Sequence, residues 1–146
     1  MDIRKRVLEV LEKGHLMSLA TADEGGVWVA DVIYVYDDEL VLYWMSSPDV
    51  RHSQALLKSP HVAGSITLSN KGGEPNLGIQ FYGRAEKIDG ARHDLAKKHF
   101  HKRGYPELEE SDDVLDGDSW YMLTPAKIEL IDEENLGFEK RTLDQL

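Results

Sequence analysis

The sequence contains no cysteine among its 146 residues. This absence excludes disulfide bonds, thiolate-ligated metal sites and cysteine nucleophiles. Long apolar runs are also missing: residues 1–14 do not resemble the core of a signal peptide, and no segment reaches the length of a membrane span. We therefore expect a cytoplasmic protein that does not enter a membrane.

Basic residues are scarce relative to acidic ones. Lysine and arginine number 17, aspartate and glutamate number 27, and the formal net charge is −10. Such an excess of negative charge disfavours binding to nucleic acid or to an anionic membrane surface, because both carry negative charge themselves. The length suits one hydrophobic core, so we predict that residues 1–146 form a single domain.

The chain does contain several short segments rich in β-branched and aromatic residues, separated by glycine- and aspartate-containing turns. These predicted strands are residues 15–22, 27–36, 40–45, 62–68, 77–87 and 120–131, the last of them interrupted at Pro125 by a bulge or an edge. Helical periodicity is found in residues 2–13, 48–58 and 91–103. The pattern predicts a mainly β (α+β) fold, a six-stranded antiparallel barrel with three peripheral helices.

Residues 42–58, LYWMSSPDVRHSQALLK, pass from a strand into a helix. Ser47 followed by Pro48 is a helix-start signal, a capping hydroxyl followed by proline at the first helical position. Hydroxyl groups and the guanidinium of Arg51 at a helix N-terminus predict an anion site, above all for a phosphate group. An ordinary strand-to-helix turn with a solvent-exposed arginine remains the alternative.

The other polar segments carry weaker signals. His93, His99 and His101 lack the i, i+4 spacing that places two imidazoles on one helical face, so we predict no metal site. The lysines and arginines of residues 91–103 indicate a solvated basic face. The acidic residues 107–118 lack the glycine and alternating carboxylates of a calcium loop and favour a surface loop.

The order of these elements resembles the pyridoxamine 5′-phosphate oxidase-like FMN-binding split-barrel flavoproteins. The segments that carry the likeness are HLMSLATADEGGVWVADVIYVY, LVLYWMSSPDVRHSQALLKSPHVAGSITL and GIQFYGRAEKI. The most specific part is a strand ending in Ser or Thr, followed five and six residues later by a basic pair, here Ser46 with Arg51 and His52. The resemblance implies that these residues hold the phosphate of flavin mononucleotide (FMN), with Ser47 adding a second hydroxyl.

The resemblance also implies contacts to the flavin ring. Residues Ala30, Asp31 and Val32 on the second strand would lie along the isoalloxazine, and Met45 would contribute beside Ser46. The family often places a glutamine on the fifth strand near the ring. Gln80, two residues beyond the matching Gly78, is the candidate for this role.

The sequence departs from that of pyridoxamine 5′-phosphate oxidase itself, the true oxidase of this family, in three places. Apolar residues near Val29 and Ala30 replace an arginine, His52 replaces a lysine, and the tail lacks the arginine-and-histidine motif for the substrate phosphate. We therefore expect a short family member that is not the true oxidase. The resemblance implies FMN, or less readily haem or a deazaflavin, at the interface of a homodimer, with a small-molecule substrate that the sequence does not identify.

Three functions follow from these observations. The leading one is an FMN-dependent oxidoreductase, for which no side chain stands out as a catalytic acid or base. The alternative is a non-catalytic protein that binds or senses flavin or haem, suggested by the absent substrate-phosphate motif. The third is a cofactor-free interaction barrel, suggested by the acidic residues 107–118.

Overall fold

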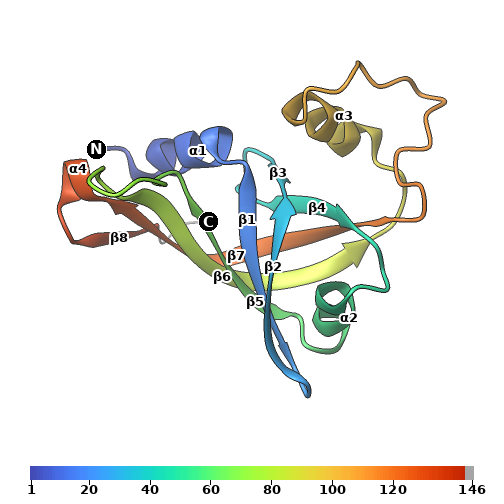
Figure 1. The fold of residues 1–146 in the computed structure, drawn as a ribbon, viewed down its shortest axis with the longest axis horizontal. Helices are drawn as coiled ribbons and strands as arrows, with labels where there is room; N and C mark the ends of the chain where they lie inside the picture. Colours follow the sequence, from blue (N-terminus) through green and yellow to red (C-terminus); the bar gives the residue numbers. More distant parts are fainter. Residues whose placement is uncertain (144–146) are drawn as a thin grey trace.

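The computed structural model describes residues 1–143, which form one eight-stranded antiparallel sheet and four helices (Figure 1). The strands are β1 (Leu16–Asp23), β2 (Gly26–Ile33), β3 (Val35–Tyr36), β4 (Leu42–Ser46), β5 (His61–Thr67), β6 (Leu77–Ile88), β7 (Ser119–Asp132) and β8 (Lys140–Leu143). The helices are α1 (Ile3–Lys13), α2 (Arg51–Lys58), α3 (His93–Lys102) and α4 (Glu133–Leu136).

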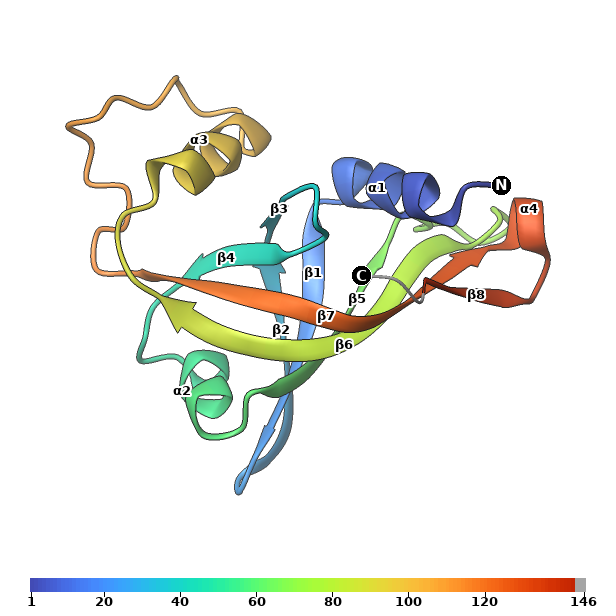
Figure 2. The ribbon, with the colours of Figure 1, turned by 180° about the vertical axis from the view of Figure 1, so that it is seen from behind.

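The sheet curls because its strand order runs β2-β1-β5-β6-β7-β4-β3, with β8 added to β7. The two end strands β2 and β3 are consecutive in the chain, so the sheet bends back on itself to bring them together at Tyr34. Figure 2 shows β6 and β7 as the long, curved strands of this sheet. The mainly β prediction is confirmed, and the curl is consistent with a split barrel.

The prediction of six strands is wrong in the described part of the chain, which has eight. The predicted strand 27–36 is two strands, because β2 pairs with β1 whereas β3 pairs with β4. The short strand β8 and helix α4 lie in the polar tail, where β8 is mostly exposed and gives little hydrophobic alternation. A fourth helix was therefore missed as well.

The predicted interruption at Pro125 is a β-bulge. Tyr82 pairs with Lys127 and Gly83 pairs with Pro125, so the register between β6 and β7 shifts by one residue. A Cβ on Gly83 would collide with the backbone oxygen of Thr124, so only glycine fits opposite the bulge. The bulge permits one continuous 14-residue β7 where the proline would otherwise break the ladder.

The interior of the curled sheet is filled by one large hydrophobic cluster. Alternate residues of the strands point inward, and Trp44 of β4 stacks on Tyr121 of β7 with ring centroids 6.1 Å apart. Helix α1 covers one end of this core through Val7, Val10 and Leu11. Helix α2 packs against β1, β2 and β6 and buries Leu56.

Helix α3 and the segment after it stand apart from the sheet in both ribbon views (Figures 1 and 2). They pack with residues of β3 and β7 in a second, smaller hydrophobic cluster. Its buried members are Val35, Leu95, Ala96, Leu108, Val114 and Trp120. Within residues 1–143, no helix has both the length and the hydropathy needed to cross a membrane.

Candidate functional site

The centre of the predicted anion site is a contact between β4 and α2. Nε2 of His52 lies 2.9 Å from Oγ of Ser46, across the turn that joins the strand to the helix. His52 is half-buried, and this burial lowers its pKa below the ordinary value, so the imidazole is neutral at neutral pH. A neutral imidazole and a hydroxyl have one donor each, and one of the two is used in this bond, so the pair keeps one donor for an anion while the bond is in place.

Arg51 precedes His52 at the first position of α2. Its guanidinium lies over the ring of Trp28, 4.5 Å from the centroid, and Nη2 donates a 3.3 Å hydrogen bond to the carbonyl of Gly25. Both partners belong to the β1–β2 hairpin, which projects alongside α2 in Figure 1. Arg51 is exposed, and a guanidinium has five N–H donors, so most of them stay available to a ligand.

The start of α2 differs from the prediction. The helix begins at Arg51, with Val50 at the N-cap and no side-chain cap hydrogen bond. Oγ of Ser47 instead accepts a 3.2 Å bond from the backbone N–H of Asp49, which stabilises the preceding turn. Ser47 and Pro48 therefore form a turn before the helix, and the first N–H groups of α2 receive no capping side chain. Such uncapped N–H groups at the positive end of a helix favour an anion.

Next to this corner lie two strand edges without a ladder partner in the described residues. β2 pairs with β1 alone, and residues 44–46 of β4 pair only with β7. Backbone N–H and C=O groups along such edges need a hydrogen-bonding partner. A flat heteroaromatic ring with polar edges would supply one, and residues 30–32 and 44–46 are the stretches that it would meet.

The side chains of the predicted ring-contact residues point in different directions. Val32 is buried in the main cluster and Ala30 is half-buried on the same inner face. Asp31 faces outward, where its Oδ1 accepts a 2.7 Å hydrogen bond from the Ser18 hydroxyl. Only backbone groups of these three residues line up along one edge.

Met45 and Gln80 are not brought to the corner by their side chains. Met45 lies on the face of β4 opposite Ser46 and packs on the small cluster around Trp120. Gln80 lies on the outer face of β6, where its Oε1 accepts a 3.1 Å hydrogen bond from Lys140. Strands β1 and β5 separate β6 from β2 in the sheet, so Gln80 lies away from the corner.

The three histidines of α3 are directed to different places. His93 lies 3.2 Å from the carbonyl oxygen of Glu110, and His99 is buried edge-on against Trp120. His101 lines a cavity between helices. Across residues 1–143, no cluster of three or more histidine and carboxylate groups is arranged to hold a metal ion.

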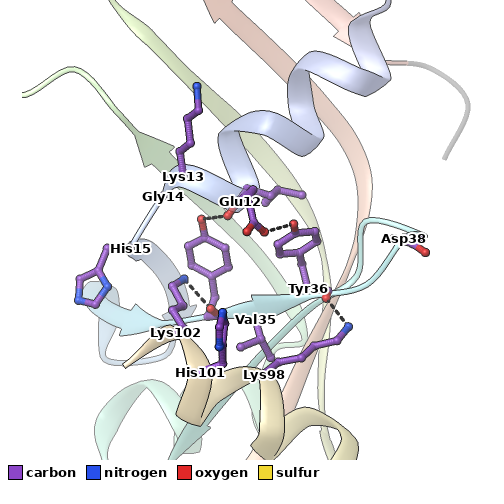
Figure 3. Close-up of a pocket in the computed structure, with 12 residues that line it drawn as sticks. Glu12, Lys13, Gly14, His15, Val35, Tyr36, Asp38, Lys98, His101 and Lys102 are labelled. Carbon is purple, nitrogen blue, oxygen red and sulfur yellow. Dashed lines mark hydrogen bonds between the residues drawn. The ribbon is translucent and has the colours of Figure 1, made fainter. Parts of the chain in front are cut away.

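That cavity, of about 530 Å³, lies apart from the predicted site and includes none of its residues. It is formed by the end of α1 and residues 14–15, by residues 34–38 around β3, and by the second half of α3 (Figure 3). Lys102 is half-buried here, so the basic face expected on α3 is only partly solvated. Sequence reasoning missed this cavity because no local pattern indicates that α1 and α3 lie on two sides of residues 34–36.

Comparisons with known proteins agree with this architecture. Residues 3–132 match the family described as "Pyridoxamine 5'-phosphate oxidase". "UPF0306 protein YhbP" of Escherichia coli O157:H7 is 28% identical over 144 residues, which span 98% of this chain and 93% of that protein.

Two solved structures show the same fold. A conserved hypothetical protein of Mycobacterium tuberculosis superposes with a TM-score of 0.79 at 14% identity, covering 99% of this chain and 92% of that one. HutZ, the heme storage protein of Vibrio cholerae, superposes with a TM-score of 0.68 at 18% identity, covering 86% and 91%. Because the sequence match extends over residues 3–132, this chain belongs to the pyridoxamine 5′-phosphate oxidase family.

Proposed function

We propose that this protein is an FMN-binding flavoprotein of the split-barrel type that acts as an oxidoreductase on a small molecule. The observation that carries the proposal is the corner where Ser46 and His52 lie 2.9 Å apart, next to Arg51 at the uncapped start of α2. A hydroxyl, an imidazole, a guanidinium and free helix N–H groups are the donors that a phosphate monoester requires. The residues present therefore fit the phosphate of FMN.

Each residue at the corner has a binding role. Arg51 would leave the carbonyl of Gly25 and turn its N–H groups toward the phosphate, and Ser46 and His52 would release their mutual hydrogen bond so that both could donate to it. The unpaired edges of β2 and β4 would offer backbone N–H and C=O groups to the polar edge of the ring and so orient it. When bound, the flavin supplies hydride-transfer chemistry, and the protein supplies position and nearby charge. We assign no catalytic residue.

We further propose a homodimer with the cofactor at the subunit interface. The β1–β2 hairpin exposes three apolar side chains in succession, Val27 (74%), Trp28 (45%) and Val29 (59%). Val29 also starts a row of outward-facing residues that crosses the sheet through Ala20 and Ala63 to the exposed Tyr82. Such an apolar row on the outer face of a sheet is typical of a protein–protein interface.

The experiment is an absorbance titration with FMN, followed by gel filtration with detection of both protein and flavin. We expect flavin to elute with protein at the mass of a dimer. Arg51→Ala should lower FMN affinity about 10- to 100-fold, because one charge-assisted contact is lost. The control is Arg141→Ala on the exposed strand β8, which should bind as the wild type does. Absence of flavin uptake, or equal affinity in both variants, would contradict the proposal.

A second candidate is a haem-binding protein without redox turnover, and it is favoured by the fold shared with HutZ. The same titration with haemin separates the two, because a Soret band that co-elutes with protein identifies haem. Steady oxidation of NADH or NADPH by the FMN-loaded protein would favour the oxidoreductase. Tight binding without turnover would favour the non-catalytic alternative.

A further inference from the structure

The cavity between α1, the β2–β3 junction and α3 has the size of a small-molecule site. Its volume is about 530 Å³, within the range of roughly 300–1,000 Å³ that such sites occupy. Figure 3 shows side chains from three separate segments of the chain converging on it. The walls combine the aromatic Tyr34 and Tyr36 with several charged groups.

The charge of this cavity is opposite to that of the whole chain. Three lysines and two histidines line it, against the carboxylates of Glu12 and Asp38, in a protein of net charge −10. The hydroxyl of Tyr36 donates a 2.5 Å hydrogen bond to Glu12. Burial, together with the neighbouring Glu12, raises the pKa of Tyr36 to about 12, so this phenol stays protonated and keeps donating to Glu12. This bond leaves the negative charge of Glu12 in place, so three lysines face two carboxylates and the lining is positive on balance.

Two lysines of α3 are held in fixed positions by backbone carbonyls. Nζ of Lys98 donates to the Tyr36 carbonyl at 2.8 Å, and Nζ of Lys102 donates to the Tyr34 carbonyl at 2.6 Å. An ammonium group has three N–H donors, so each lysine keeps two for another acceptor. Lys102 also lies over the ring of Tyr34, with Nζ 3.4 Å from the centroid. Fixed ammonium groups pay less entropy when they bind a ligand.

The charged form of the half-buried Lys102 is destabilised by burial, and a negative partner would stabilise it. Burial lowers its pKa to about 8, even though the charge of Glu12 acts in the opposite direction. At pH 7 the ammonium form still predominates, held by a carbonyl and an aromatic ring. An anion placed beside it would offset part of the desolvation that burial imposes.

We propose that this cavity binds a small organic anion, with a phosphate or carboxylate group between Lys98 and Lys102 and an aromatic body against the half-buried Tyr36. The site is separate from the corner at Ser46, Arg51 and His52 and does not depend on FMN binding there. Phosphate and carboxylate ligands share the chemistry that the two ammonium groups recognise. A comparison of phenyl phosphate with benzoate shows which of the two groups binds more tightly.

The experiment measures binding of phenyl phosphate, benzoate and inorganic phosphate to the full chain by titration calorimetry and by chemical shifts of α3 amides. Lys98→Gln and Lys102→Gln should each weaken binding of the aromatic probes about tenfold, because one charge-assisted hydrogen bond is lost. The matched control is Lys97→Gln, since Lys97 is exposed on α3 and does not line the cavity. Inorganic phosphate should bind more weakly than phenyl phosphate because it lacks the ring.

A second readout separates a ligand site from a purely structural role of the lysines. The affinity of the wild type should fall as pH rises through the pKa of Lys102, and this fall should be reduced in Lys102→Gln. The other titratable groups facing Lys102 and the cavity are Glu12 and Lys13 on α1, Tyr34, Tyr36 and Asp38 on the β2–β3 side, Lys98 and His101 on α3, and His15. Lys98→Gln, at an exposed position, covers the case in which Lys102→Gln fails to fold.

Repeating the titrations in Arg51→Ala tests whether the probes occupy this cavity or the α2 corner. Retained binding in Arg51→Ala, with loss in the Lys98 and Lys102 variants, supports the proposal for either anion. Three results would overturn it: no aromatic probe binds at millimolar concentration, all three lysine variants bind equally, or only Arg51→Ala loses binding.

Discussion

The curled sheet and the α3 region are held together in different ways. Inside the sheet, one large cluster includes side chains from α1, α2 and most strands, and its largest members, Trp44, Tyr34 and Tyr121, are fully buried. The α3 region has only the small cluster around Trp120 and Leu95. Polar bonds complete its attachment, among them Nε1 of Trp120 donating to the carbonyl of Ala91 at 2.8 Å.

This difference indicates that the two regions open at different free energies. Stability in proteins follows the density of buried apolar contacts, and regions with few such contacts open first. The cavity between α1, the β2–β3 junction and α3 lies where the two regions meet. There Lys98 and Lys102 donate hydrogen bonds to the carbonyls of residues 34–36. A ligand in that cavity would therefore add contacts where the fold has fewest of its own.

Trp44→Ala should destabilise the sheet region and give the largest loss of unfolding free energy among these variants. Trp44 is fully buried and stacked on Tyr121, so its truncation leaves a large cavity and costs about 3–5 kcal/mol of unfolding free energy. Urea denaturation followed by circular dichroism measures this value. A loss under about 1 kcal/mol would show that the core repacks around the site.

Leu95→Ala tests the α3 region in the same way. Leu95 is buried in the small cluster, and we expect a cost near the lower end of the leucine-to-alanine range, about 2 kcal/mol. Native-state hydrogen exchange should show faster exchange in α3 and unchanged exchange in β5 and β6. Equal acceleration in the sheet would mean that the two regions unfold as one unit.

Asp132→Asn tests how much the polar contacts between α1 and β7, at one end of the sheet, contribute to stability. This buried carboxylate accepts a 2.9 Å hydrogen bond from Arg6, and Asn135 donates to it as well. Burial by itself would raise the pKa of Asp132, but these hydrogen bonds outweigh it and lower the pKa below the ordinary value. Asp132→Asn should cost about 1–3 kcal/mol at pH 7.

The pH dependence of that loss gives a second check. Because the pKa of Asp132 is lower in the folded state, its contribution is present above the unfolded pKa of about 4 and is lost as pH falls through the folded value. The stability gap between wild type and Asp132→Asn should therefore narrow in acid. The control is Glu9→Gln, which removes the more exposed partner of Arg6 and should change stability much less than Asp132→Asn does, because water screens an exposed ion pair. A gap that stays constant down to pH 3 would contradict the assignment.

His99 should make the docking of α3 less stable in mild acid. This change in stability is expected to be the smallest of those predicted here. Its ring is buried against Trp120, and burial, with Lys102 and Arg103 nearby, lowers its pKa to about 4. The unfolded histidine binds a proton near pH 6.5, so docking of α3 is fully stable above that pH and weakens as pH falls toward 4.

Protection factors of α3 amides should accordingly fall on the order of tenfold from pH 7 to pH 5. His99→Leu should remove most of this dependence, whereas His101→Gln, at an exposed position, should keep it. Unchanged protection in the wild type at pH 5 would show that His99 is charged without loss of docking.

Much of the fold follows from local sequence. Alternation of apolar and polar residues located the principal strands, and Pro125 predicted a bulge or an edge because proline cannot donate to a ladder; the structure shows the bulge. The stripe of Val7, Val10 and Leu11 located α1, which Asp2 caps through the backbone N–H of Lys5. The start of α2 was misplaced because the same Ser-Pro pair suits a turn and a helix start equally well at short range.

The sequence by itself determined the principal strands and helices, and it placed Ser46, Arg51 and His52 within a stretch of seven residues. Only the tertiary structure decided that Arg51 lies on Trp28, that Gln80 lies on the outer face with Lys140, and that Lys98 and Lys102 meet residues 34–36. Hydrogen bonding and hydrophobic periodicity act over a few residues and can be recognised locally. Contacts between distant segments depend on strand order and on the curl of the sheet, which arise only when the whole chain packs.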